Sequence, residues 1–147
     1  MKRNRREGDG TTPLGRMAIT GSFGLAAKST TALPYRRVLE RDCWISDVAD
    51  PAYNRRVRRA RCAPPNEDLH RIAASGAYEF ALTTDYNTSP ILVGKGSAIF
   101  VHVHSYISAG RTKSTSGCVS VSRVAMKRLF ALLDPAKNPT MVVRINR

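Results

Sequence analysis

The last third of the chain carries the pattern that most restricts the fold. Residues 98–104 are small, β-branched and aromatic, which predicts a β-strand. A polar stretch at 105–117 predicts a loop. Ser122 then caps a predicted helix that runs to about Leu133 and has one apolar face at helical spacing. A final strand is predicted over 140–145.

The earlier part of the chain predicts shorter elements. Strands are expected at 16–20, where Gly21 and Gly24 end the strand, and at 77–84. A short helix is expected to begin near Asn66, with the next two acidic residues in its first turn, where the helix dipole favours them. Strands with few helices and no alternation of strand and helix predict a mainly β, α+β domain.

Two histidines and a cysteine are the candidates for chemistry. Alternate residues of a strand face the same way, so Phe100, His102 and His104 share one face. A polar loop follows and leads to Gly117 and Cys118. A loop of that length can bring a thiol to an imidazole, which can take the thiol proton, and the glycine lets backbone amides approach a substrate carbonyl.

Other interpretations of these residues remain open. A lone cysteine beside a Ser/Thr/Gly loop is often structural, and a His-X-His strand often serves packing. His102, His104 and Cys118 are also acceptable zinc ligands, although water would have to supply the fourth ligand. That arrangement would suit a metal-dependent hydrolase.

The chain is strongly basic, with 24 Lys and Arg against 11 acidic residues and a net charge of +13. This predicts either a solvated cationic surface or an anionic partner. Five arginines within 55–61 would suit nucleic acid, but no stacking aromatics, helix-turn-helix or zinc-finger spacing accompany them, so we expect no nucleic-acid partner. No stretch is apolar enough for a membrane span.

Several ordered blocks resemble the L,D-transpeptidase (YkuD-like) catalytic domain. The blocks are residues 7–15 (EGDGTTPLG), Cys43-Trp44, Tyr53-Asn54, 85–87 (DYN), 94–102 (GKGSAIFVH) and Gly117-Cys118 preceded by Ser116. The resemblance covers nearly all of residues 1–147. It implies a single β-sandwich-like catalytic domain with the site in a cleft.

The resemblance also implies an activity. Such enzymes cut the bond between the L-residue and the terminal D-residue of a peptidoglycan tetrapeptide stem, form an acyl-enzyme on cysteine and pass the acyl group to an amine of a neighbouring stem. Cys118 is then the nucleophile, His102 its base, and the amides of Gly117 and Cys118 the oxyanion donors. Ser116 stands where many relatives have a second histidine. His104 is an extra imidazole that either steers a substrate carboxylate or fills space.

No cofactor or metal is expected for this chemistry, and the rival interpretation is a non-catalytic cationic module that binds peptidoglycan or nucleic acid. The localisation that the resemblance implies is the cell envelope, outside the cytoplasmic membrane. Cys43 and Cys62 either pair there or remain two thiols. Because no export signal is visible behind Met1 and the resemblance begins almost there, we expect the N-terminal part of the domain to be missing.

Overall fold

The computed structural model describes residues 4–145. Its elements in chain order are β1 (Gly15–Gly24), β2 (Tyr35–Arg37), β3 (Asp42–Trp44), β4 (Arg56–Arg58), β5 (Glu67–Asp68), α1 (Leu69–Ala74), β6 (Phe80–Thr84), β7 (Phe100–Val103), β8 (Tyr106–Ser108), β9 (Arg111–Thr112), β10 (Val119–Val121), α2 (Arg123–Leu132), a 3-10 helix (Pro135–Lys137) and β11 (Thr140–Val143). The predicted mainly β class with few helices is confirmed. Within the described range, no helix is long and apolar enough to cross a bilayer.

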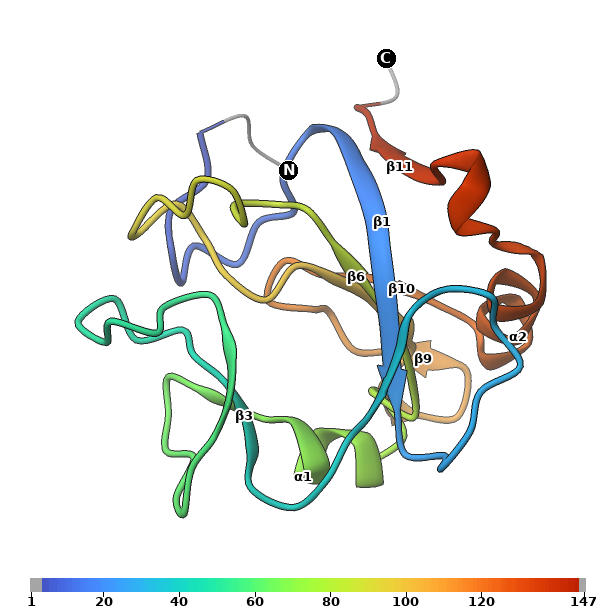
Figure 1. Cartoon of the computed structure of the whole chain (residues 1–147), viewed down its shortest axis with the longest axis horizontal. Helices are drawn as coiled ribbons and strands as arrows, with labels where there is room; N and C mark the ends of the chain where they lie inside the picture. Colours follow the sequence, from blue (N-terminus) through green and yellow to red (C-terminus); the bar gives the residue numbers. More distant parts are fainter. Residues whose placement is uncertain (1–3, 146–147) are drawn as a thin grey trace.

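The main sheet has the strand order β10-β7-β6-β1-β11, and β2 pairs with β1 (Figure 1). The neighbours β7 and β10 are parallel, with Val101 opposite Val119 and His102 opposite Ser120. Cys118 immediately precedes β10. The pairing therefore brings the start of β10, with its cysteine, beside the strand that carries His102.

Helices and a second sheet cover the two faces of the main sheet. On one face α2 buries Met126 and Phe130 against a cluster that includes Val101 and Val103. On the other face, Phe100 packs in a second cluster with residues of α1. Alternate residues of β7 thus enter opposite clusters, as the pattern of residues 98–104 predicts. In Figure 1, α2 and α1 lie on opposite sides of β1.

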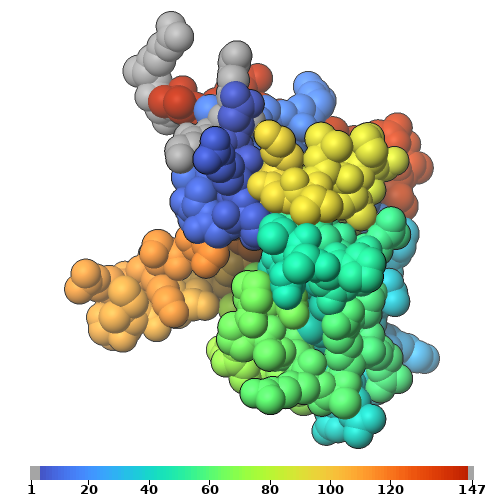
Figure 2. Space-filling model, turned by 90° about the vertical axis from the view of Figure 1, so that its left-hand side faces the viewer, coloured from blue at the N-terminus to red at the C-terminus, as the bar shows by residue number. Residues whose placement is uncertain are grey.

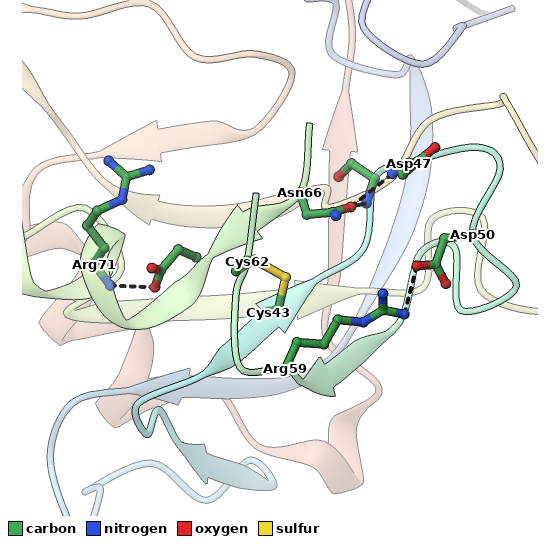
Figure 3. Close-up of a disulfide and its surroundings, with 9 residues drawn as sticks. Cys43, Asp47, Asp50, Arg59, Cys62, Asn66 and Arg71 are labelled. Atoms are coloured by element: carbon green, nitrogen blue, oxygen red, sulfur yellow. Dashed lines mark hydrogen bonds and ion pairs between the residues drawn. A yellow bond between two sulfur atoms is a disulfide. The ribbon is translucent and has the colours of Figure 1, made fainter. Parts of the chain in front are cut away.

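The second sheet has the order β4-β3-β5 and continues into α1. A disulfide joins Cys43, in its central strand, to Cys62 (Figure 3). Of the two alternatives for these cysteines, the structure has the bonded pair, and Cys118 is left as a free thiol. Beside the disulfide, the Asn66 Oδ1 accepts hydrogen bonds from the backbone N–H groups of Ser46 at 2.9 Å and Asp47 at 3.0 Å.

The prediction that the first strand breaks at Gly21 is wrong, because β1 runs through Gly21 and ends at Gly24. These glycines serve close packing instead. A Cβ on Gly21 would lie 3.1 Å from the Pro34 carbonyl oxygen, and one on Gly24 would overlap the carbonyl oxygen of Glu79. Both positions are buried, so a side chain there would push neighbouring backbone away from β1.

The expected start of the first helix is also wrong. Glu67 and Asp68 form β5, which pairs with β3, and the helix begins at Leu69. Asp68 is its N-cap, accepting a hydrogen bond from the Arg71 N–H at 2.9 Å. The predicted Ser122 cap of α2 is confirmed by a 3.1 Å bond from the Ala125 N–H.

The other predicted elements agree in type but differ in length. The strands are shorter than expected at 77–84, 98–104 and 140–145. The polar stretch 105–117 contains the two-stranded hairpin β8-β9 as well as loop. All residues of its two strands are exposed, so these strands have no buried face that hydrophobic periodicity could reveal.

Candidate active site

A cleft of about 710 Å³ opens where the main sheet, the second sheet and the N-terminal segment meet. Its lining includes Arg5, Glu67, Tyr78, His102, Ser116 and Cys118. Figure 2 shows this face, with the hairpin β8-β9 (orange) projecting on one side, the segment that includes β5 and α1 (green) on the other, and the N-terminal segment (blue) above. The cysteine and the base that the sequence predicts therefore face one cavity.

Backbone groups at the start of β7 and just before it bind the sulfur of Cys118. The thiol donates to the Ala98 carbonyl oxygen at 3.1 Å, and the sulfur accepts from the Phe100 N–H at 3.4 Å. A hydrogen bond from the Tyr78 hydroxyl also stabilises the thiolate form. These contacts fix the direction of the side chain.

The thiol is not ionised in the resting site. Burial is the main reason that the pKa of Cys118 rises to about 12, and the nearby Glu67 carboxylate raises it further, while the Phe100 N–H and Tyr78 hydroxyl oppose the rise. From the sequence, the imidazole is expected to take the thiol proton. In the structure the thiol of Cys118 is neutral and keeps this proton.

His102 is buried in β7 and has one ring nitrogen committed. Its Nδ1 lies 2.7 Å from the Val103 carbonyl oxygen. Because a carbonyl only accepts hydrogen bonds, Nδ1 carries the hydrogen and Nε2 keeps its lone pair. Burial lowers the pKa of His102 from its ordinary value, so the ring is neutral at neutral pH. This is the tautomer and charge state of a general base.

The turn that carries Cys118 is held by Thr115. The Thr115 hydroxyl donates to the Cys118 carbonyl oxygen at 2.6 Å, and the Gly117 N–H donates back to the same hydroxyl at 3.3 Å. Gly117 has a φ of +134°, which L side chains rarely adopt. We call Thr115–Cys118 the catalytic turn.

Arg5 is buried beneath the catalytic turn. Its guanidinium donates to the Thr11 carbonyl oxygen and, at 3.4 and 3.5 Å, to the Ser116 carbonyl oxygen. It also occupies the space where a Cβ on Gly117 or Gly96 would lie. The cation lowers the pKa of Cys118, opposing the burial effect.

The motif blocks that are far apart in sequence meet at the segment before β7. Asn54 Oδ1 accepts from the Ala98 N–H at 3.0 Å and from the Trp44 indole at 2.9 Å. The Tyr53 hydroxyl accepts from the Gly96 N–H at 3.1 Å and donates to Glu7. These bonds fix the position of Ala98, whose carbonyl holds the thiol.

A family model for the L,D-transpeptidase catalytic domain (YkuD) matches residues 2–145, almost the whole chain. The chain belongs to this L,D-transpeptidase family. No curated protein and no solved structure matches it significantly. Membership supports an L,D-transpeptidase-type, acyl-transferring activity on peptidoglycan in the cell envelope.

Of the other two residues predicted for the site of this L,D-transpeptidase domain, Ser116 lines the cleft and His104 does not. Ser116 is exposed on the cleft wall, and its carbonyl, not its hydroxyl, makes the contact with Arg5. His104 lies past the end of β7, outside the cleft lining, where its Nδ1 is 2.9 Å from the Ser120 hydroxyl. The alternative zinc site is not formed, since no three His, Cys, Asp or Glu side chains in the described residues are placed to hold a metal ion.

Sequence reasoning missed three residues of this site: Arg5, Glu67 and Tyr78. Arg5 sits in a basic run at the chain start, and Glu67 was expected only to favour a helix. Tyr78 was one aromatic among others in a strand pattern. The available signal was the EGDG block beside Arg5, but Ser116 and Cys118, the residues that connect Arg5 and Tyr78 with the thiol, lie far along the sequence.

Proposed function

We propose that this domain is an L,D-transpeptidase that cross-links peptidoglycan tetrapeptide stems through an acyl-enzyme on Cys118, with His102 as the base. The observation that carries the proposal is the presence of a free thiol and a neutral imidazole with an unprotonated Nε2 in the lining of one cleft. The family match supports the reaction class.

In the acylation half, the sulfur attacks the carbonyl carbon of the L-centre that precedes the terminal D-residue. The S–C bond forms as the thiol proton passes to Nε2 of His102. The tetrahedral intermediate then expels the amine of the D-residue, which takes that proton from the imidazolium. The thioester and the free D-amino acid are the products.

In the second half, an amine of a neighbouring stem attacks the thioester. The neutral imidazole accepts a proton from this amine and returns one to the departing sulfur. The amide bond that forms is the cross-link, and the free thiol is regenerated. Water in place of the amine would give carboxypeptidase trimming by the same route.

The backbone amides of Gly117 and Cys118 are the proposed oxyanion donors. The Gly117 N–H now donates to the Thr115 hydroxyl at 3.3 Å, a long bond that a developing oxyanion can replace. Arg5, immediately behind the turn, adds positive charge to this region. Removing one such donor in comparable enzymes lowers kcat by about 10²–10³-fold.

The charge of the domain supports an anionic donor stem. Lys113 and Arg5 line the cleft beside the catalytic turn, and the net charge of +13 favours approach of stem carboxylates. The proposed partners are peptidoglycan stem peptides, with no nucleic acid and no resident cofactor. Extracytoplasmic work in the periplasm or wall follows from that substrate.

A carbapenem tests the proposal, because its strained ring acylates a nucleophilic cysteine. Intact-protein mass spectrometry should find one covalent adduct on the wild type and none on Cys118→Ala. His102→Gln should acylate about 10²–10⁴-fold more slowly. His70→Gln, on α1, is the matched control and should acylate like the wild type.

The adduct must also correspond to turnover. Incubation with a tetrapeptide stem should release the terminal D-amino acid and give a cross-linked dimer from the wild type only. If the folded wild-type protein forms no adduct and no dimer but still sediments with purified sacculi, it is a binding module, and the catalytic proposal is wrong.

A further inference from the structure

Glu67 and Tyr78 are hydrogen-bonded to each other in the same cleft as Cys118. The Tyr78 hydroxyl donates to Glu67 Oε2 at 2.7 Å. The same hydroxyl can hydrogen-bond a thiolate at Cys118, and this interaction lowers the pKa of Cys118. Tyr78 is buried, and its ring packs edge-on against His102, with centroids 5.3 Å apart. The three polar groups therefore form one connected unit in the cleft.

Glu67 is the cleft acid that the Tyr78 hydroxyl contacts. No Lys, Arg or His in the described part of the chain forms an ion pair with it. Burial raises the pKa of Glu67 to about 7, the Glu7 carboxylate raises it as well, and the Tyr78 hydrogen bond opposes the rise. Near neutral pH the carboxyl therefore exists in both protonation states.

The other charged or titratable groups around this unit come from four segments. They are Arg5 and Glu7 of the N-terminal segment, Asp47 after β3, His102 of β7 and Lys113 after β9. Arg5 lowers the pKa of Cys118 and Glu7 raises the pKa of Glu67. Among the residues that the structure describes, Tyr78 is the one that both hydrogen-bonds to Glu67 and acts on the pKa of Cys118 through its hydroxyl.

The Tyr78 hydroxyl has one hydrogen, which it can donate either to the Glu67 carboxylate or to a thiolate at Cys118. The unit therefore has two states. When Glu67 is ionised, Tyr78 donates to the carboxylate, and the neutral S–H keeps its hydrogen bond to the Ala98 carbonyl oxygen. When Glu67 is protonated, the carboxyl donates to the tyrosine oxygen, and the hydroxyl proton is free to bond the thiolate. A negative charge on Glu67 therefore opposes a negative charge on Cys118.

We propose that Glu67, acting through the Tyr78 hydroxyl, controls the ionisation of the Cys118 thiol. Within the singly charged unit, the thiol proton moves to the tyrosine oxygen as the tyrosine proton moves to the carboxylate, so that charge and protons balance. Glu67 is a positioning residue, while Tyr78 touches the reacting sulfur. This control rests on the proposed role of Cys118 as the nucleophile.

Alkylation of Cys118 by iodoacetamide tests the proposal without any peptide substrate. In the wild type, the logarithm of the alkylation rate should rise with pH up to about 7 and flatten above it, because ionised Glu67 then opposes the thiolate. Glu67→Gln should remove this bend. Its thiolate absorbance should titrate at least one unit lower than that of the wild type.

The size of the rate change follows from thiol chemistry. Each unit by which the pKa falls multiplies the thiolate fraction about tenfold below the midpoint, but the less basic thiolate is about threefold less nucleophilic. We therefore expect Glu67→Gln to be alkylated about threefold faster at neutral pH for each unit of pKa shift. Asp47→Asn, which removes a cleft carboxylate without a path to the sulfur, should keep the wild-type profile.

Tyr78→Phe separates the hydrogen-bond path from a simple field effect. It keeps the ring against His102 but removes the hydroxyl, so adding Glu67→Gln to it should change the thiol titration less than in the wild type. The proposal is overturned if the alkylation rate of the wild type shows no bend with pH, or if Glu67→Gln leaves the thiol titration unchanged. It is also overturned if Glu67→Gln shifts the thiol titration equally with and without Tyr78→Phe. None of these readouts depends on transpeptidation, so failure of the carbapenem assay is a separate result.

Discussion

Replacing Gly117 by alanine tests whether the catalytic turn must have the geometry described here. The φ of +134° costs an L-residue about 1–2 kcal/mol or more. The added Cβ would also lie 2.8 Å from the Thr11 carbonyl oxygen and overlap the Arg5 guanidinium. Overpacking of this kind adds about 1–3 kcal/mol. Gly117→Ala should therefore lower the free energy of unfolding by about 2–5 kcal/mol.

Gly110→Ala is the matched control because it has the cost of a positive φ without any steric overlap. Gly110 also has a positive φ, of +74°, in the hairpin loop, but no atom lies within 4 Å of its would-be Cβ. The free energy of unfolding of Gly110→Ala should fall by only about 1–2 kcal/mol. In a domain of this size each kcal/mol corresponds to about 2–4 °C in Tm, so two thermal melts separate the variants.

The functional readout is the rate of carbapenem acylation, measured at a temperature where both variants are folded. Displacing the Gly117 amide should slow acylation by Gly117→Ala about 10²–10³-fold, while Gly110→Ala should match the wild type. If folded Gly117→Ala acylates at the wild-type rate, the turn does not supply the oxyanion donor, and the reasoning from its geometry is refuted.

Three further predictions concern stability. The pKa of Glu67 rises from about 4.5 unfolded to about 7 folded, so its ionisation destabilises the fold as pH increases through this window. Glu67→Gln should thus be more stable than the wild type by about 3 kcal/mol at pH 8 but not at pH 4, in urea titrations at both pH values. Reducing Cys43–Cys62, which closes a separation of 19 residues, should cost about 3 kcal/mol, measured in a Cys118→Ala background with and without reductant; an unchanged melting curve would contradict this. Phe100→Ala should cost about 3–5 kcal/mol, because its ring is 1% exposed, and a loss under 1 kcal/mol in the same titration would show that the core collapses around it.

The elements that local pattern determines could be predicted from the sequence. The helix after Ser122 has its cap and its apolar stripe within one stretch of chain. The strand with His102 has β-branched residues in alternation. In both cases the information lies within a few residues, so periodicity and capping were sufficient.

The failures came from residues whose surroundings lie elsewhere in the chain. Glu67 is in a strand because it pairs with Trp44. β1 continues through Gly21 to Gly24 because the backbone of Pro34 and Glu79 packs closely against these two glycines. The state of the thiol also depended on distant groups, since burial and the carboxylate of Glu67 set the pKa of Cys118. Family resemblance named the two central residues without giving their protonation states.

The contact between Arg5 and Ser116 joins positions 111 residues apart. During synthesis, the early segment must wait for most of the polypeptide to emerge before it can brace the turn beside the thiol. Full nucleophilic competence should therefore appear only at the end of folding. Nascent chains that end before residue 118 carry the supporting cation without the cysteine, and so have no thiol at this site to be acylated.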